Sequence, residues 1–296
     1  MRESSNPIMR GVIRDNKKDA NGYATFGTGM AGAGQASMMQ GQQQHAAQYT
    51  QPGYSPSTTS RSLTIDDVVT KTAMTLGTVI VFAVAAYFFI SSRGTVDDQL
   101  AVASPIMAVG AIVGLVLVLV ASFGRKQDNP AIVLAYAAFE GLFVGAISFV
   151  FANVMVSDVS AGTLIGQAVL GTLGVFVGML VVYKVGAIRV TPRFTRMLMA
   201  GLFGVLALVI GNLVVGLFND GHGFGIRDGG PIAIIFSLVC IALAAFSFLI
   251  DFDSADQLIR AGAPSKAAWG VALGLTVTLV WLYVEILRLL SILNSD

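Results

Sequence analysis

Seven long apolar runs constrain the fold of this 296-residue chain more than any other feature. Each run has about the 20 residues that a helix needs to cross the hydrocarbon core of a bilayer. Strands of a membrane barrel alternate over about ten residues, so runs of this length predict helices. The predicted spans are residues 73–91, 100–123, 130–151, 159–183, 196–218, 231–250 and 268–292. We therefore expect an all-α integral membrane protein, built as a bundle of seven transmembrane helices.

The N-terminal segment, residues 1–62, has a different composition from the rest. Residues 27–51 are mostly Gly, Ala, Gln, Met and Ser, which bury too little apolar surface to offset the entropy of an ordered chain. We predict a disordered tail there, either a simple tether or a docking segment for a partner membrane protein. The membrane domain would cover residues 63–296, with Thr64 capping its first helix.

Charge sets the expected orientation of the chain. Charged residues make up 12% of the sequence, against roughly 25% in soluble domains. A net charge of +1 gives no reason to expect a nucleic-acid partner. Lysine and arginine gather in the loops on the side of the tail, whereas the opposite loops hold only Arg93 and Arg227. The loops on the tail side contain Arg125, Lys126, Lys184, Arg189, Arg193, Arg196, Arg260 and Lys266. The positive-inside rule then predicts a multi-pass plasma-membrane protein with a cytoplasmic N-terminus and an external C-terminus.

Four carboxylic acids inside or at the ends of the spans are the candidate functional residues: Glu140, Asp251, Asp253 and Glu285. A carboxylate at the bilayer centre costs about 2.5–3.5 kcal/mol, so such residues usually face a bundle interior or a water-filled cavity. Glu140 has no basic residue within a helical turn. It would either serve the passage of ions or protons, or be a protonated carboxyl group bonded to a neighbouring helix. Asp251 and Asp253 diverge by about 200° on a helix, so only one can face the bundle axis. The alternative is that both are ordinary residues at the membrane boundary, in contact with water.

Glu285 has a basic neighbour, Arg288, at the spacing of an intrahelical ion pair. It lies roughly 25 Å along the helix from Ala268, toward the outer face. The pair is either structural or part of an ion path. Together the carboxylates would be staggered from the inner face, through mid-depth, to the outer face. Oxygen ligands suit hard cations, so this pattern favours a path for cations or protons.

Catalytic motifs are missing from the sequence. Of the two histidines, His45 lies in the tail and His222 in a predicted outer loop, so no histidine lies in a predicted span. There is no HExxH, GxSxG or phosphate-binding Gly-Lys-Ser/Thr motif. The single cysteine, Cys240, excludes an intrachain disulfide and a thiolate metal cluster. We expect neither an enzyme nor a bound metal or cofactor, with calcium as a permeant ion at most. The glycine pairs Gly141/Gly145 and Gly174/Gly178 predict close helix packing.

Several short segments resemble the transmembrane Bax-inhibitor-motif family, in a bacterial branch of actinobacterial type. The resemblance covers about residues 63–293 and includes the last span, which finishes Leu287-Arg288-Leu289-Leu290. Residues 4–7 and 63–71 match the same subgroup. The sixth run ends in the acidic segment Phe248-Leu249-Ile250-Asp251-Phe252-Asp253.

This resemblance implies that the last helix runs through the centre of the other six, in a pH-sensitive calcium or cation leak channel. It further implies a latch of two aspartates, one ending the sixth helix and one in the seventh, that opens and closes with protonation. Asp251 or Asp253 matches the first aspartate. The second would fall near Thr278, which is not acidic. Glu140 and Glu285 are the candidates for a related proton-sensitive role in this chain.

Three functions follow as hypotheses. The first is a cation leak, for calcium, gated by protonation of semi-buried carboxylates. The second is a non-conducting membrane regulator of a stress response or of a membrane protease, which would use the tail to bind its partner. The third is a proton-coupled transporter, for which the sequence names no substrate.

Overall fold

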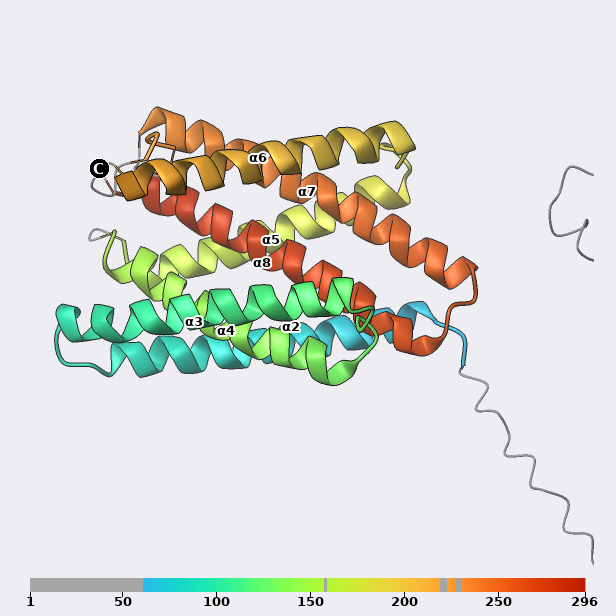
Figure 1. Cartoon of the computed structure of the whole chain (residues 1–296), viewed down its shortest axis with the longest axis horizontal. Coiled ribbons are helices and arrows are strands. Elements are labelled where there is room, and N and C mark those ends of the chain that lie inside the picture. Colours follow the sequence, from blue (N-terminus) through green and yellow to red (C-terminus); the bar gives the residue numbers. More distant parts are fainter. Residues whose placement is uncertain (1–60, 157–158, 219–222, 227–229, 296) are drawn as a thin grey trace, which may run out of the picture. The chain divides into compact units, whose positions relative to one another are not determined.

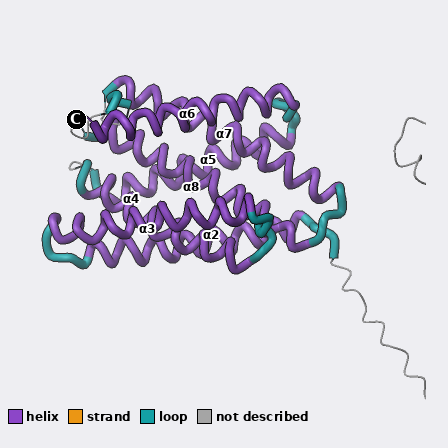
Figure 2. Tube along the Cα trace, viewed as in Figure 1, coloured by secondary structure: helices purple, strands orange, loops and turns teal. Residues whose placement is uncertain are grey.

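The computed structural model describes residues 61–156, 159–218, 223–226 and 230–295. Within them are seven α-helices long and apolar enough to cross a membrane (Figures 1 and 2), which confirms the predicted fold class. The helices are α2 (Ile65–Ser91), α3 (Val96–Phe123), α4 (Pro130–Asn153), α5 (Ala161–Lys184), α6 (Pro192–Phe218), α7 (Pro231–Arg260) and α8 (Ala268–Leu293). A short 3₁₀ turn, η1 (Ser265–Ala267), precedes α8. The predicted tail lies outside the described residues, apart from Arg61 and Ser62.

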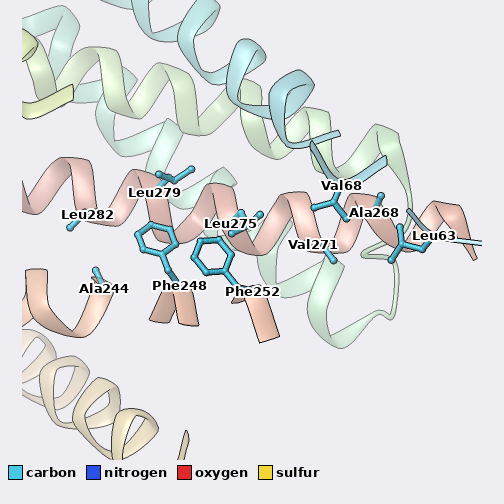
Figure 3. Packing of buried hydrophobic residues seen from close by; sticks show 10 residues of the cluster. All are labelled: Leu63, Val68, Ala244, Phe248, Phe252, Ala268, Val271, Leu275, Leu279 and Leu282. Carbon is cyan, nitrogen blue, oxygen red and sulfur yellow. The ribbon is translucent and has the colours of Figure 1, made fainter. Parts of the chain in front are cut away.

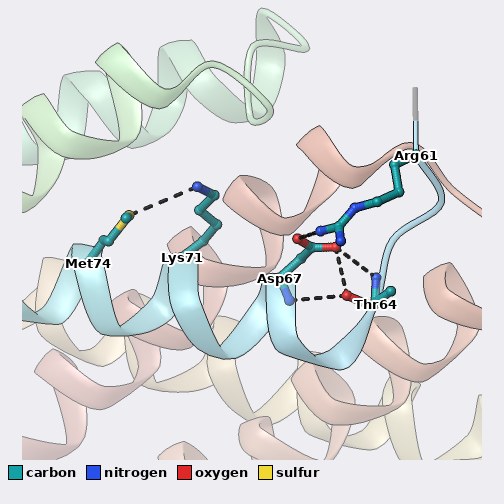
Figure 4. Close-up of polar contacts among 5 residues, drawn as sticks. All are labelled: Arg61, Thr64, Asp67, Lys71 and Met74. Atoms are coloured by element: carbon teal, nitrogen blue, oxygen red, sulfur yellow. Dashed lines mark hydrogen bonds and ion pairs between the residues drawn. The ribbon is translucent and has the colours of Figure 1, made fainter. Parts of the chain in front are cut away.

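The first helix begins where the sequence places it. Thr64 caps α2 through a reciprocal capping box: its hydroxyl accepts from the amide of Asp67, and the Asp67 carboxylate accepts from the amide of Thr64. Arg61 forms an ion pair with the same carboxylate (Figure 4). These contacts satisfy amide groups that the first helical turn leaves without intrahelical partners.

Helix α8 is the most deeply buried of the seven. It packs against α2, α4, α5 and α7, whereas α3 packs mainly on α4 and α6 on α7. In Figure 1, α8 crosses α5 and runs between α7 on one side and α2, α3 and α4 on the other. Phe248 and Phe252 of α7 lie against Leu275, Leu279 and their neighbours on α8 (Figure 3). The last helix is therefore central.

Small residues bring α4 and α2 into close contact. A Cβ at Gly141 would collide with the backbone of Val79, and one at Gly145 with the backbone of Ala83. This packing face is as predicted from the spacing of the two glycines. The prediction for Gly174 and Gly178 of α5 is wrong, because no atom of another described helix lies within 4 Å of the place of a Cβ at either residue.

Helix α7 extends ten residues past the predicted end of the sixth span, from 250 to Arg260. The apolar run stops at Asp251, but polar pairs one turn apart sustain the helix. Asp253 accepts a hydrogen bond from Gln257 at 2.6 Å, and Asp256 pairs with Arg260 at 2.7 Å. Asp251 and Asp253 therefore lie inside the helix rather than at its end.

The segment before α2 is bonded to the connection between α7 and α8. The amide of Leu63 donates to the carbonyl of Ala263 at 2.7 Å, and the amide of Ser265 donates to the carbonyl of Arg61 at 2.8 Å. Leu63 is buried in the same cluster as α8 residues. The beginning of α2 and the beginning of α8 are thus joined at one end of the bundle.

Candidate functional site

A cavity of about 430 Å³ lies at the end of the bundle where α2 begins and α7 ends. We call it the vestibule. The α3–α4 loop contributes Arg125, Gln127 and Asp128 to its wall, and α7 contributes Asp251 and Ser254. Polar side chains therefore line a cavity at this end of the bundle.

Small residues on α8 form the inner wall of the vestibule. Gly270 and Gly274 line it, and Thr278 follows at the same spacing of four, so the three share one helix face. A Cβ at Gly274 would lie 3.6 Å from Oδ1 of Asp251. The carboxyl group of Asp251 therefore lies next to the backbone of α8 at Gly274.

The carboxyl group of Asp251 is hydrogen-bonded to the central helix. The hydroxyl of Thr278 donates to Oδ2 of Asp251 at 2.8 Å, and Thr278 itself is 7% exposed. We call this bond the clasp. Thr278 occupies the position at which the family resemblance implied a second aspartate. A hydroxyl and a carboxyl group meet here, where the resemblance implied two carboxyl groups.

Asp253 lies on a different face of α7. Its carboxylate accepts from Gln257, and the hydroxyl of Tyr183 on α5 lies 3.5 Å from its Oδ1. The two aspartates thus diverge, with Asp251 directed at α8 and Asp253 at the end of α5.

An ion pair stands at the rim of the vestibule. Nζ of Lys266 in η1 lies 2.7 Å from Oδ2 of Asp128 in the α3–α4 loop. This hydrogen-bonded ammonium group lowers the pKa of the Asp128 carboxyl from its usual value of 3.8. The Asp128 carboxyl therefore stays ionised through the neutral pH range.

Glu140 is half-buried between α4 and α3. Its carboxyl interacts with the hydroxyl of Tyr136 one turn earlier, and a Cβ at Gly114 of α3 would lie 2.8 Å from its Oε2. Glu140 does not line the vestibule. The structure places it in a separate polar contact between two helices.

Glu285 forms a buried ion pair with Arg288. Their side chains are 7% and 4% exposed, and Oε2 of Glu285 lies 2.9 Å from Nη2 of Arg288. Arg288 also donates from Nη2 and Nε to the hydroxyl of Ser237 on α7, at 2.8 and 3.2 Å. Its guanidinium lies 5.5 Å from the ring centre of Phe236. Polar bonds thus join helices α7 and α8 at the clasp and again at Ser237.

The match to a known family decides what kind of protein this is. A family model described as Bax inhibitor 1 like matches residues 13–295. The chain belongs to this family. The match begins well before residue 63, so the family relationship extends into the predicted tail. Comparison with curated proteins gave no match. The Bax inhibitor 1 like chain is a multi-pass membrane protein, and its helices lie in a lipid bilayer.

Two features of the Bax inhibitor 1 like site do not emerge from the sequence. One is the role of Thr278 as the partner of Asp251, although the resemblance points to its position. The other is the face of small residues at Gly270 and Gly274, for which the spacing of four before Thr278 is the available signal. Within the described residues, no group of three or more His, Cys, Asp or Glu is placed to hold a metal ion.

Proposed function

We propose that this Bax inhibitor 1 like protein is a passive cation leak, for calcium, and that the clasp between Asp251 and Thr278 is its gate. One observation carries the proposal: the carboxyl group of Asp251 belongs to the wall of the polar vestibule and is also bonded to the central helix. A group in that position meets an arriving cation and controls the contact between α7 and α8. From the Lys and Arg count we place the vestibule on the cytoplasmic side.

The chemistry of the vestibule suits a hard cation in transit. Carboxylate, hydroxyl and backbone carbonyl oxygens are the ligands that calcium takes. Conduction requires binding weak enough for the ion to leave. A single carboxylate at the clasp meets this requirement better than a cluster of acidic groups would.

The clasp gives the gate its dependence on pH. Hydrogen bonds to an ionised carboxylate are roughly twice as strong as bonds between neutral groups. Thr278 therefore holds ionised Asp251 more firmly than protonated Asp251. Proton binding to Asp251 and opening of the gate are therefore coupled, and each favours the other. The leak should increase as the pH falls.

The other charged groups of the vestibule do not supply this response. Asp128 and Lys266 are paired at the rim, and the lowered pKa of Asp128 keeps that carboxyl ionised well below neutral pH. Arg125, the remaining charged residue of the described lining, is not part of the clasp. This leaves Asp251 as the titrating group whose proton affinity changes when the clasp opens.

A threonine in place of a second aspartate gives the response a sign opposite to that of a pair of carboxyl groups. Two adjacent carboxyl groups repel when both are ionised and hold together by sharing a proton. Such a latch closes when a proton binds. The bond between Thr278 and Asp251 needs no added proton, so the clasp in this chain loosens when one binds.

The test is calcium influx into liposomes that contain a calcium-sensitive dye and the purified full-length protein. Wild type should admit calcium faster than empty liposomes, and faster near pH 6 than near pH 8, with the pH set equally on both sides. No influx above empty liposomes, with the protein shown to be folded, would favour the non-conducting regulator. Saturable flux that needs an added solute would favour the transporter.

A further inference from the structure

A second cavity, of about 380 Å³, opens on the side of the bundle rather than at its end. We call it the lateral groove. Helices α2 and α5 form its two edges, and α4 and α8 form its floor. Its wall includes residues from Leu76 to Phe88 on α2 and from Ile165 to Leu173 on α5. All four helices are predicted membrane spans, so the groove faces hydrocarbon.

The lateral groove offers apolar contacts only. Of the described residues that line it, none is charged. The hydroxyls of Tyr283 and Ser148 in its floor are bonded to each other at 2.8 Å. The hydroxyl of Thr172 donates to the carbonyl of Ala168 at 2.8 Å, and that of Tyr87 accepts from Asn153 at 2.9 Å. These bonds within the protein leave a ligand with few polar partners to meet.

The length of the groove matches one leaflet of a bilayer. Leu76 and Phe88 are twelve residues apart, which corresponds to about 18 Å along α2. Half of a hydrocarbon core is about 15 Å thick. Phe88 lies near the end of α2 at Ser91, and Ile165 lies near the start of α5. The groove therefore runs from one membrane surface to the middle of the bilayer.

The length of the groove favours a hydrocarbon chain over a partner helix. A transmembrane helix spans about 30 Å of hydrocarbon, whereas the groove extends along only about 18 Å of α2. An acyl chain of one leaflet matches that length. A free fatty acid would also find no cation in the described lining to pair with its carboxylate.

We propose that the lateral groove binds one acyl chain of a phospholipid from the leaflet at the Ser91 end of α2. The headgroup stays at the membrane surface, and the chain lies against α8 at Leu279, Val280 and Tyr283. In the orientation proposed above this is the outer leaflet. The proposal is independent of whether the protein conducts ions.

The test is to fill the groove with larger side chains and to count the lipid molecules that the protein retains. Val169→Trp and Leu173→Trp together place two large side chains in its α5 edge. The matched control is Leu170→Trp with Val177→Trp, on the same helix but outside the groove. Full-length protein is extracted with a mild detergent from phosphatidylglycerol vesicles, and native mass spectrometry measures the lipid that remains bound. Wild type and control should each retain one phospholipid, and the filled variant should lose it.

Three results would overturn the proposal: equal retention by the filled and control variants, no lipid on wild type, or a bound mass equal to a free fatty acid. A second measurement covers the case in which the filled variant does not fold. Phosphatidylglycerol with a spin label in the middle of one chain should show an immobilised component with wild type in vesicles. The absence of that component would also refute the proposal.

Discussion

Replacement of Thr278 by valine tests the clasp while it leaves Asp251 in place. Valine has nearly the shape of threonine but lacks the hydroxyl that donates to Oδ2 of Asp251. Thr278 is 7% exposed, so its methyl group keeps its packing. The variant thus removes the bond and retains the carboxylate that meets the cation.

The size of the effect follows from the strength of the bond. A hydrogen bond to a charged group contributes about 1.5–3 kcal/mol, and the lower end applies because water in the vestibule can reach Asp251. A loss of about 1.5 kcal/mol from the closed state shifts the equilibrium between closed and open roughly tenfold. Calcium influx near pH 8 should therefore rise roughly tenfold, and it should no longer increase as the pH falls.

The assay is calcium influx into liposomes at matched protein density, with Thr276→Val as the control. Thr276 is fully buried on the same helix, and its hydroxyl has no hydrogen-bond partner among the described residues. The control should behave as wild type. A wild-type rate and pH response in Thr278→Val would refute the role of the clasp, and an equal increase in both variants would show a general packing defect instead.

Three further outcomes are expected. Thr278→Asp creates a pair of carboxyl groups that needs a shared proton to hold, so influx should fall as the pH falls; an unchanged response would contradict the sign given to the clasp. Lys266→Ala removes the partner of Asp128 and should lower the free energy of unfolding by about 0.2–1 kcal/mol, because the pair is partly exposed. The pKa of Asp128 is lowered by folding, so the stabilisation by this ion pair is present above about pH 4 and is lost as the pH falls below that value. Urea titrations of both proteins near pH 7 and pH 3 check this dependence. Equal losses of stability at the two pH values would contradict it. Ser237→Ala removes the hydroxyl bonded to Arg288 and should cost about 1–3 kcal/mol of stability, measured by thermal melting; an unchanged melting temperature would show that the bond between α7 and α8 contributes nothing.

The membrane architecture follows almost entirely from hydropathy. Runs of spanning length predicted each of the seven helices, because a bilayer requires every backbone polar group to be satisfied within its segment. The N-cap at Thr64 was also predictable, since capping depends on residues close in sequence. The end of α7 was not, because its last turns are held by Asp256, Arg260 and their neighbours after the apolar run has stopped.

The candidate site could be predicted only in part. Asp251, Glu140 and Glu285 stand out in the sequence because charge is rare inside spans. Their environments depend on which helices meet: Asp251 lines a cavity, Glu140 contacts α3, and Glu285 pairs with Arg288. The staggered carboxylates therefore occupy three separate settings. The pairing of Asp251 with Thr278 spans 27 residues and two helices, and local sequence patterns do not encode it.

The most direct test of the central claim is the pH response of Asp251→Asn beside wild type. Calcium influx by wild type should rise from near pH 8 to near pH 6, whereas the asparagine variant, which cannot change its charge, should show a constant rate. A wild-type rate that falls on acidification, or an asparagine variant that keeps the full pH response, would contradict the assignment of the gate to Asp251.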